Sequence, residues 1–283
     1  MKPLNFMTIG DRSFFHTIAY SVKQTAKFYP DARFYIYDMG FSASQVAELR
    51  DGNTTVVPWA NKTARLPARA YARVLLPLML KGPRWFIAKG PARLHRNLRI
   101  FAGKPKCILD CLRRSDGDVV FLDGDAFLVN DIDAVVSEDF DVGVTMRRLG
   151  EIIYPRKNGE CRVLNVGVMV FKGGARRLES FMRRWSDEVK VTDDFCIEQT
   201  ALTNLVATTR DDIYDDFNKI GILDLGDDRI KIKVLPCETY NFNWIEEGFD
   251  LEKNRILHFK GGRHSVEKFE ELKRRIGLDE VEK

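Results

Sequence analysis

The order of strand-like and helix-like segments in the N-terminal third constrains the fold most strongly. Strand-like apolar runs at 4–9, 32–38 and 54–59 alternate with helical patterns at 14–28 and 42–51. Such alternation is typical of parallel strands with helices packed on them. The sequence therefore predicts an α/β protein with a nucleotide-binding style of sheet.

The same kinds of segment return in the second half of the chain. Gly82-Pro83 and Gly90-Pro91 interrupt the region between 60 and 104, which we expect to leave the sheet as an inserted subdomain. Beyond it we expect strands at 118–122, 139–146, 164–172, 232–236 and 255–259, and helices at 104–115, 174–190, 198–206 and 265–277.

Four Asp-x-Asp triplets lie close together, at 116–118, 123–125, 131–133 and 139–141. Two carboxylates one residue apart suit a hard divalent cation when the chain turns between them. Asp116 and Asp118 precede the strand at 118–122 in a turn-like Ser-Asp-Gly-Asp segment, and Asp131 and Asp133 resemble a helix start.

Only Asp123 and Asp125 follow directly after a buried strand. Ligands of open α/β sheets bind outside the carboxyl ends of the strands, so this pair reaches the functional edge. Gly124 between them fits a tight turn, and it lets a ligand approach the backbone. We therefore predict the metal site at Asp123 and Asp125.

The charge distribution is strongly asymmetric. The net charge is +4, yet residues 62–114 carry fourteen Lys or Arg and one acidic residue, whereas 115–283 carry 25 basic and 35 acidic residues. The basic block can line an anion site, touch anionic lipid or bind nucleic acid, or it can be a solvated surface.

The cysteines and the apolar segments bear on the compartment. Five scattered cysteines without a Cys-x-x-Cys pair favour a reduced, cytoplasmic protein without a structural zinc site. The apolar run at 4–9 is too short for a signal peptide, and no run of about 18 apolar residues is present to span a bilayer. Peripheral membrane contact through the basic block is compatible with this expectation.

Five segments carry a resemblance to a known family. VVFLDGDAFLVNDI resembles the Asp-x-Asp segment of GT-A fold glycosyltransferases that use nucleotide sugars, especially the retaining family 8 enzymes and related nucleotide-diphosphosugar transferases. LNVGVMVF is similar to their Asn-x-Gly strand, EQTALTNL to their Asp-Gln-x-x-Leu helix, ILHFKGG to their His-x-x-Gly ending, and residues 6–38 to their opening strand, helix and strand.

These matches occur in the family's order and cover most of the chain. The resemblance implies a GT-A (Rossmann-like) fold, in which helices flank a mixed, mostly parallel sheet. It implies one catalytic domain over 1–283, and we interpret 62–103 as a basic helical insertion within it.

The resemblance makes Asp123, Asp125 and His258 the ligands of Mn²⁺ or Mg²⁺. A nucleotide diphosphosugar leaves as a diphosphate, whose charge such a metal neutralises. The imidazole ligand favours Mn²⁺. Taken alone, a histidine at a strand end is more often bonded to a neighbour, and the His-x-x-Gly context reverses that interpretation.

The resemblance places Gly261 where backbone amides meet the diphosphate. The family continues with proline and then lysine, but here Gly262 is followed by Arg263 and His264, so Arg263 is the charge available for the phosphates. Thr8 and Asp11 fall where family members contact the nucleobase and ribose.

A further basic residue of the family lies on the helix before the Asp-x-Asp strand, in a Tyr-Ala-Arg-Leu pattern. A YARV segment contains Arg73, but about 50 residues separate it from Asp123. Lys106 stands at the more family-like distance, and we favour it over Arg73.

Asn165 resembles the amide near donor sugar and acceptor, and Glu198 and Gln199 match the acidic-Gln pair. In retaining transfer, either the leaving diphosphate deprotonates the acceptor or a side chain forms a covalent glycosyl intermediate. Glu198 is the better nucleophile and Gln199 the better stabiliser of an oxocarbenium-like centre, and the sequence leaves both open. An acidic residue at a helix N-terminus also has a purely structural explanation.

The favoured function is metal-dependent, retaining transfer of a sugar from a UDP-sugar to a glycan, lipid-linked or protein acceptor. Tyr240, Asn241 and Trp244 either flank the acceptor or pack beneath a late strand. One alternative is an anion- or RNA-binding protein acting through 62–114, although that block lacks the interleaved aromatics of a stacking platform, and we do not expect nucleic acid. The other is a nucleotidyltransferase, for which TIGDRS is a poor phosphate loop.

Overall fold

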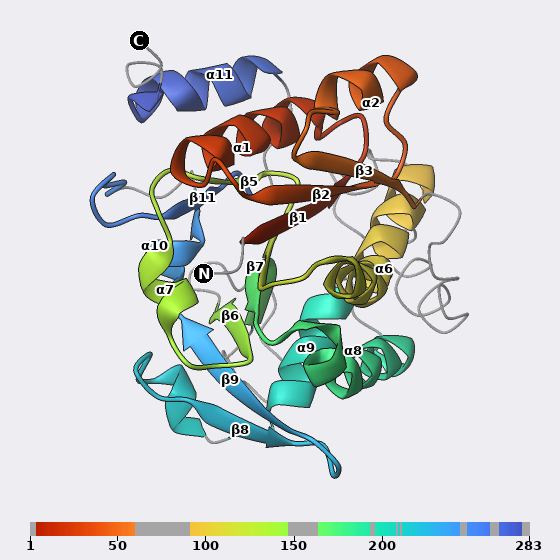
Figure 1. Ribbon diagram of the computed structural model, residues 1–283, viewed down its shortest axis with the longest axis vertical. Helices are drawn as coiled ribbons and strands as arrows, with labels where there is room; N and C mark the ends of the chain where they lie inside the picture. Colours follow the sequence, from red (N-terminus) through yellow and green to blue (C-terminus); the bar gives the residue numbers. More distant parts are fainter. Residues whose placement is uncertain are drawn as a thin grey trace.

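The computed structural model describes residues 4–59, 91–146, 164–192, 196–207, 209, 211–243, 248–260 and 266–278, with only the backbone described at 91–98. Its main sheet has the strand order β3-β2-β1-β4-β7-β6-β9-β8 (Figure 1). These strands are β1 (Asn5–Gly10), β2 (Arg33–Asp38), β3 (Thr54–Pro58), β4 (Val119–Leu122), β6 (Val142–Met146), β7 (Leu164–Phe171), β8 (Gly221–Asp224) and β9 (Arg229–Leu235).

The sheet is mixed and mostly parallel, as predicted. β3, β2, β1 and β4 are mutually parallel, and β6 is parallel to β9. β7 runs antiparallel to β4 and β6, and β8 runs antiparallel to β9. Six strands therefore share one direction, and their carboxyl ends form one edge.

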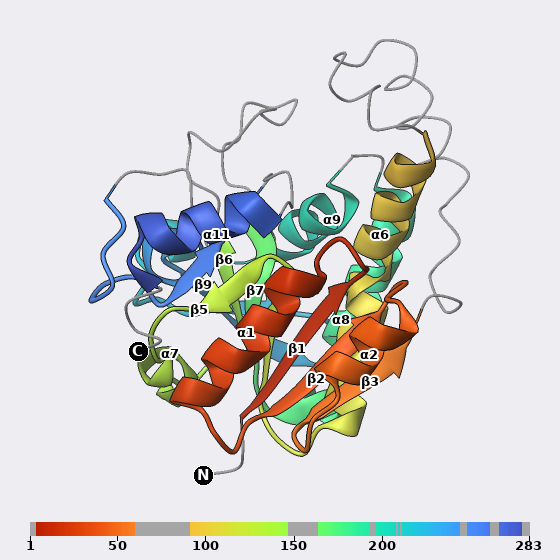
Figure 2. The same ribbon diagram turned by 90° about the horizontal axis from the view of Figure 1, so that it is seen from above.

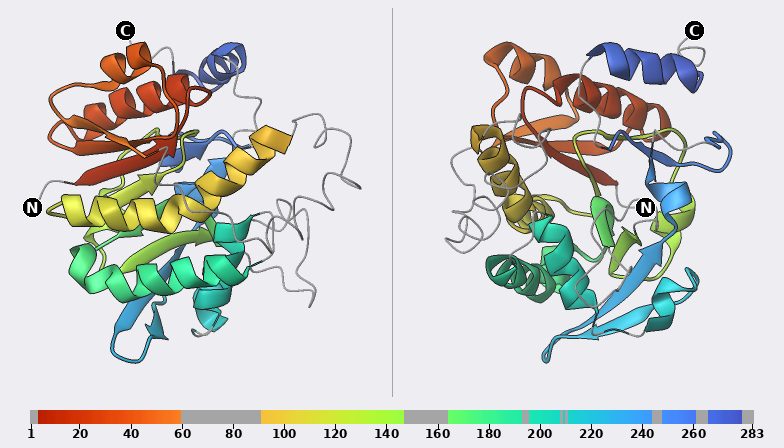
Figure 3. Two further views of the ribbon diagram at one scale, coloured as in Figure 1. Left: turned by 90° about the vertical axis from the view of Figure 1, so that its right-hand side faces the viewer. Right: turned by 180° about the vertical axis from the view of Figure 1, so that it is seen from behind.

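Helices cover both faces of this sheet. The helices of the described residues are α1 (Phe15–Phe28), α2 (Ala43–Leu49), α6 (Pro91–Arg114), α7 (Asp133–Ser137), α8 (Gly174–Val191), α9 (Ile197–Val206), α10 (Cys237–Tyr240) and α11 (Val266–Arg275), with a 3₁₀ helix at Asp211–Tyr214. Figure 3 shows α1 and α2 on one side and α6 and α8 on the other.

The alternation of side chains along each strand creates two cores. In β4, Val119 and Phe121 pack toward α6, α8 and α9, whereas Val120 and Leu122 pack toward α1 and α7. Because every strand position is apolar and buried, both faces must be covered. This is why the sequence pattern of fully apolar strands predicted the layers correctly.

A second, smaller sheet lies over α1. It has the order β10-β11-β5, with β5 (Ala126–Leu128), β10 (Phe242–Asn243) and β11 (Ile256–His258). A third core joins it to α1 and α11, and in it the Phe269 ring meets the rings of Tyr20 and Phe127. Figure 2 shows α11 beside α1 and β5.

Helix α6 begins earlier than the sequence predicted, at Pro91 rather than at residue 104. Gly103 and Pro105 lie inside it, and both residues normally weaken a helix interior. Ile100 and Ala102 are buried in the core against the sheet, which stabilises the helix across those positions. Residues 91–103 of the predicted insertion therefore belong to α6, and residues 62–90 lie outside the described part.

None of the helices in the described ranges is long and apolar enough to cross a membrane.

Trp185 of α8 packs against the start of α9 and is hydrogen-bonded to it. It is fully buried, and its indole Nε1–H donates to the backbone oxygen of Glu198 at 2.9 Å. Leu178, Phe181, Met182 and Val189 continue the same apolar stripe, which confirms the core packing expected for this helix. The first turn of α9 is thereby held at a fixed position.

We expect Trp185→Phe to lower the free energy of unfolding by about 1–3 kcal/mol, since it removes this hydrogen bond and fills the space incompletely. Hydrogen exchange should accelerate at the amides of α9. The control is Phe181→Leu, which loses packing on the same stripe but no bond to α9. Equal exchange of α9 in the two variants would contradict the role assigned to the indole.

Candidate functional site

The turn that carries Asp123 and Asp125 is wedged between β1, α1 and β7. The Asp123 N–H donates to the Gly167 oxygen at 2.8 Å, and the Ala126 N–H donates to the Asp123 oxygen at 2.9 Å. A Cβ on Gly124 would lie 3.2 Å from the Ile9 oxygen and from Phe14 atoms. Close packing against β1 and the start of α1 therefore favours glycine at position 124.

Strand pairing brings His258 to this turn. β11 runs antiparallel to β5 with His258 opposite Ala126, the residue after Asp125. His258 Nε2 lies 3.1 Å from Asp125 Oδ1 and 3.9 Å from Asp123 Oδ2. The structure thus brings the three predicted ligands together, with one ligand atom from each within 4.8 Å of the others.

This donor set fits a divalent cation. Two carboxylates and an imidazole suit Mn²⁺, and Mg²⁺ accepts the carboxylates. Asp125 and His258 are 7% and 5% exposed, whereas the Asp123 side chain is 22% exposed. A ligand can therefore approach a cation here from the side of Asp123.

Gly167 makes room for the His258 ring. A Cβ at this position would lie 2.2 Å from His258 Cε1 and 2.6 Å from its Nδ1. Nε2 faces the two aspartates, and Nδ1, on the other side of the ring, lies 2.8 Å from Asn241 Oδ1. Asn241 is fully buried, and its amide lies against the imidazole ring of His258.

Lys104 of α6 places a positively charged side chain next to Asp123 and Glu198. Its Nζ lies 2.7 Å from Asp123 Oδ1 and 3.3 Å from Glu198 Oε1, and the residue is 3% exposed. Burial alone would lower the pKa of Lys104, but the charges of Asp123 and Glu198 outweigh burial and raise it. Lys104 therefore places an ammonium group beside the predicted metal site.

The lysine that reaches Asp123 is Lys104 and not Lys106, which the sequence had favoured. Lys106 is exposed, since residues two apart on a helix do not share a face. A signal for Lys104 exists in the sequence: it lies at helical spacing between Ile100 and Ile108 on the apolar stripe. The predicted helix start at 104 concealed that stripe.

Glu198 and Gln199 begin α9 and are 1% and 8% exposed. Burial raises the pKa of Glu198, although the neighbouring Lys104 opposes the rise. Glu198 Oε2 and Gln199 Oε1 are both buried and have no hydrogen-bond partner among the described residues. Since buried polar atoms are nearly always hydrogen-bonded, these two atoms favour a polar ligand.

Asn165 is 4% exposed and lies on β7, at an irregularity of the ladder with β6. Its Oδ1 accepts from the Gly167 N–H at 2.7 Å and from Asn241 Nδ2 at 3.0 Å. Both acceptor positions of this oxygen are therefore used. The Nδ2 group is the part of Asn165 that remains to contact a ligand.

Thr8 and Asp11 lie at the end of β1, next to β4. Met7 pairs with Phe121, so Thr8 is level with Leu122, just before the acidic turn. Thr8 Oγ1 is buried without a partner among the described residues. Asp11 Oδ1 accepts from the N–H of Ser13 at 2.8 Å and from its hydroxyl, which orders the entry to α1.

Two predicted phosphate contacts, Gly261 and Arg263, lie outside the described residues, as do His264, Arg73 and Trp244.

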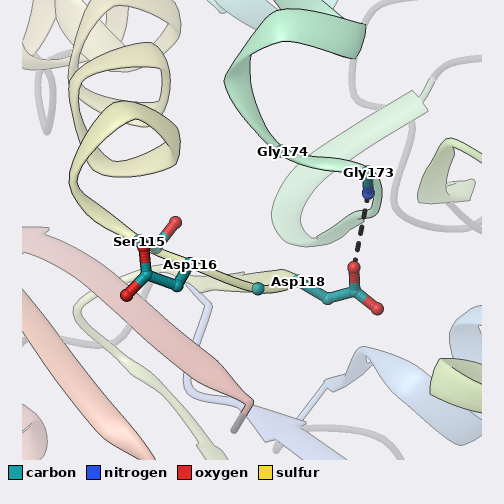
Figure 4. Close-up of a pocket in the computed structure, with 6 residues that line it drawn as sticks. Ser115, Asp116, Asp118, Gly173 and Gly174 are labelled. Carbon is teal, nitrogen blue, oxygen red and sulfur yellow. Dashed lines mark hydrogen bonds between the residues drawn. The ribbon is translucent and has the colours of Figure 1, made fainter. Parts of the chain in front are cut away.

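The other Asp-x-Asp pairs have structural partners. Asp118 Oδ1 accepts from the Gly173 N–H at 3.3 Å in the hollow of Figure 4, at the amino-terminal end of β4. Asp131 accepts from the Asp133 N–H at the start of α7, and Asp141 pairs with Arg177. Only the 123–125 pair belongs to a cluster of metal-ligating side chains in the described part of the chain.

Comparison with family models finds no match, and neither does comparison with curated proteins. Among solved structures, the chain is similar to the bifunctional glycosyltransferase WbbM in its apo form, with a TM-score of 0.51 and 12% identity over 92% of this chain and 46% of that one. The chain thus spans about half the length of WbbM.

Two other glycosyltransferases are similar at lower TM-scores. The galactosyltransferase LgtC, in complex with donor and acceptor sugar analogues, matches with a TM-score of 0.47 and 15% identity over 95% of this chain and 94% of LgtC. A glycosyltransferase involved in glycosylation of the major capsid of PBCV-1 matches with 0.49 and 9% over 96% and 99%. The likeness to WbbM confirms the predicted glycosyltransferase fold, and the fold alone.

We expect Gly167→Ala to weaken Mn²⁺ binding about tenfold or more, because the new methyl group displaces the His258 ring. The matched control is Gly143→Ala in the neighbouring strand β6, where the new Cβ would lie 2.9 Å from the Phe140 ring, away from His258. Both variants should lose about 1–3 kcal/mol of stability through overpacking. Calorimetric titration with Mn²⁺ compares them, and equal losses of affinity would contradict the assignment.

We expect Lys104→Met to lower the free energy of unfolding by about 3–5 kcal/mol, because it leaves the buried Glu198 without its cation. Lys106→Met, on the exposed face of the same helix, should stay within about 0.5 kcal/mol of the parent. Adding Glu198→Gln to Lys104→Met should recover part of the loss in urea denaturation. A double variant no more stable than Lys104→Met would show that the ion pair is not the cause.

Proposed function

We propose that this protein is a metal-dependent glycosyltransferase that transfers a sugar from UDP-sugar to an acceptor with retention of the anomeric configuration. The observation that carries the proposal is the convergence of Asp123, Asp125 and His258, with ligand atoms within 4.8 Å, at the end of β4 in a glycosyltransferase-type fold. The sequence resemblance supplies the nucleotide and the stereochemistry.

Asp123, Asp125 and His258 would hold the metal, with Mn²⁺ favoured by the imidazole. Bound there, the metal supplies the charge that neutralises the diphosphate leaving group. Lys104, fixed beside Asp123, adds a second positive charge at the same place. Gly261 and Arg263 remain proposals for the diphosphate contacts, and Thr8 and Asp11 for the nucleoside.

Glu198, Gln199 and Asn165 are the residues proposed for the sugar. Glu198 Oε2 and Gln199 Oε1 have unmet acceptor capacity among the described residues, which suits sugar hydroxyl groups. Asn165 can donate only through Nδ2, since its oxygen is already bonded twice. In this proposal Asn165 orients the sugar through its Nδ2 group. The two mechanisms under consideration are a covalent intermediate at Glu198 and same-face transfer beside Gln199.

The acceptor is a glycan, a lipid-linked molecule or a protein. Cytoplasmic location and peripheral contact with a membrane through the basic block also remain proposals. Much of that block, residues 62–90, lies outside the described part of the chain.

Titration of the metal-stripped protein with UDP tests the proposal. We expect UDP to bind with Mn²⁺ and much more weakly without it, since the diphosphate needs the cation's charge. Asp125→Asn should abolish the Mn²⁺ dependence by removing a ligand. The matched control is Asp116→Asn, in another Asp-x-Asp triplet, whose carboxylate lies on the surface away from the site.

Wild-type protein that binds UDP should then be tested for hydrolysis of UDP-sugars, with the anomer of the released sugar read by NMR. An inverted anomer would overturn retention. Absence of UDP binding with and without Mn²⁺ would reject the proposal, and release of pyrophosphate from a nucleoside triphosphate would favour the nucleotidyltransferase alternative.

A further inference from the structure

The two nitrogens of the His258 ring face different groups. Nε2 faces Asp125 and Asp123, whereas Nδ1 faces Asn241 Oδ1 at 2.8 Å. A neutral imidazole carries its proton on one nitrogen and can bind a cation only through the other. The direction of the Asn241 amide therefore decides whether His258 can serve the metal site.

Two backbone groups fix that direction independently. The Gly167 N–H can only donate, so the Asn165 atom it meets at 2.7 Å is the amide oxygen. The atom of Asn241 that meets this same oxygen at 3.0 Å must then be the amide nitrogen. Its carbonyl oxygen consequently points to His258.

The second anchor passes through Thr145. Its hydroxyl donates its single hydrogen to the backbone oxygen of Asn165 at 3.2 Å, so toward Asn241 it can only accept. It accepts from Asn241 Nδ2 at 2.6 Å. Both hydrogens of the Asn241 amide are thus used, and both routes give the same orientation.

The chain of hydrogen bonds is closed to water. Thr145 and Asn241 are fully buried, and Asn165 and His258 are 4% and 5% exposed. Reversal of the Asn241 amide would place its oxygen against two acceptors, Asn165 Oδ1 and Thr145 Oγ1, and would leave both of their bonds to Asn241 unmade. Because buried polar groups without partners are costly, the reversed arrangement is disfavoured.

We propose that Asn241 is a positioning residue that holds the proton of His258 on Nδ1, so that Nε2 is the nitrogen presented to the metal between Asp123 and Asp125. This proposal depends on the proposed function in one respect only, the presence of a metal ion between Asp123 and Asp125. In this proposal, the hydrogen bonds that run from the Gly167 N–H through the side chains of Asn165 and Asn241 form a relay that orients the His258 ring. Outer partners of this kind commonly change metal affinity about ten- to hundredfold when they are removed.

The first test reads the proton directly. Long-range ¹H–¹⁵N correlation spectra of the full-length, metal-stripped chain report whether each ring nitrogen carries hydrogen, and His258→Gln identifies the His258 signals by difference. We expect His258 Nδ1 to resonate as a protonated nitrogen. An unprotonated Nδ1 would overturn the proposal, whatever the protein does with UDP.

The second test uses Asn241→Leu, which keeps the bulk but removes the relay. We expect the Nδ1 signal to lose its protonated character or to split between tautomers, and Mn²⁺ affinity to fall about ten- to hundredfold. The matched control is Asn254→Leu at another buried asparagine, whose amide bonds the Asp250 N–H and the Glu238 oxygen and not His258, so the Nδ1 proton and Mn²⁺ affinity should persist. Circular dichroism checks that both variants are folded.

The outcomes separate the two proposals. Wild-type affinity for Mn²⁺ in folded Asn241→Leu would overturn the positioning role. Wild-type protein that binds no Mn²⁺ would reject the proposed function, while the nitrogen spectra still decide the position of the proton. If Asn241→Leu does not fold, the wild-type spectrum alone confirms or refutes the proton on Nδ1.

Discussion

The placement of one buried lysine between two carboxylates, beside the predicted metal ligands, is the constraint on which the site depends. Asp125 and Glu198 are 7% and 1% exposed, Asp123 is partly exposed, and Lys104 bridges Asp123 and Glu198. A buried ion is stable only when opposite charge compensates for its lost solvation. The proposed divalent cation would add positive charge beside this pair, where Asp123, Asp125 and His258 lie together.

The two sheets meet where this charge is gathered. Asp123 follows β4 of the main sheet directly, and Asp125 precedes β5 of the small sheet, so the turn between them joins both sheets. The antiparallel register of β5 and β11 then delivers His258, because a slip by one residue would turn its side chain to the other face. The third core, around Phe269, supports the small sheet from α11. Elements distant in sequence thus bring Asp123, Asp125 and His258 together.

The sequence predicted what depends on local patterns. Val119–Leu122 was identified because all four residues are apolar, and that strand placed Asp123 and Asp125 at the functional edge. The predicted start of α6, at residue 104, was wrong. Gly103 and Pro105 locally oppose a helix, and burial of Ile100 and Ala102 outweighs that preference. That error also concealed Lys104 in favour of Lys106. The short strands β5 and β10 have too few residues to show a period.

The role of Asn241 was beyond sequence reasoning for another reason. Its partners Thr145, Asn165 and His258 come from three different strands, and no spacing along the chain relates them. His258 was found only through the His-x-x-Gly context. The residues that hold it in orientation carry no comparable pattern, because a buried asparagine in a loop is ordinary until its hydrogen bonds are known.

Gly167 connects a pattern in the sequence with the geometry of the site. Its oxygen accepts from the Asp123 N–H, its N–H orients the Asn165 amide, and its missing Cβ leaves space for the His258 ring. One strand residue therefore contacts both the turn that carries Asp123 and the imidazole of His258. The two backbone functions are available to any residue in this strand, but the space is available only to glycine. The Asn-x-Gly pattern is thus explained by local geometry, because the asparagine receives the glycine N–H and the glycine leaves space for the His258 ring.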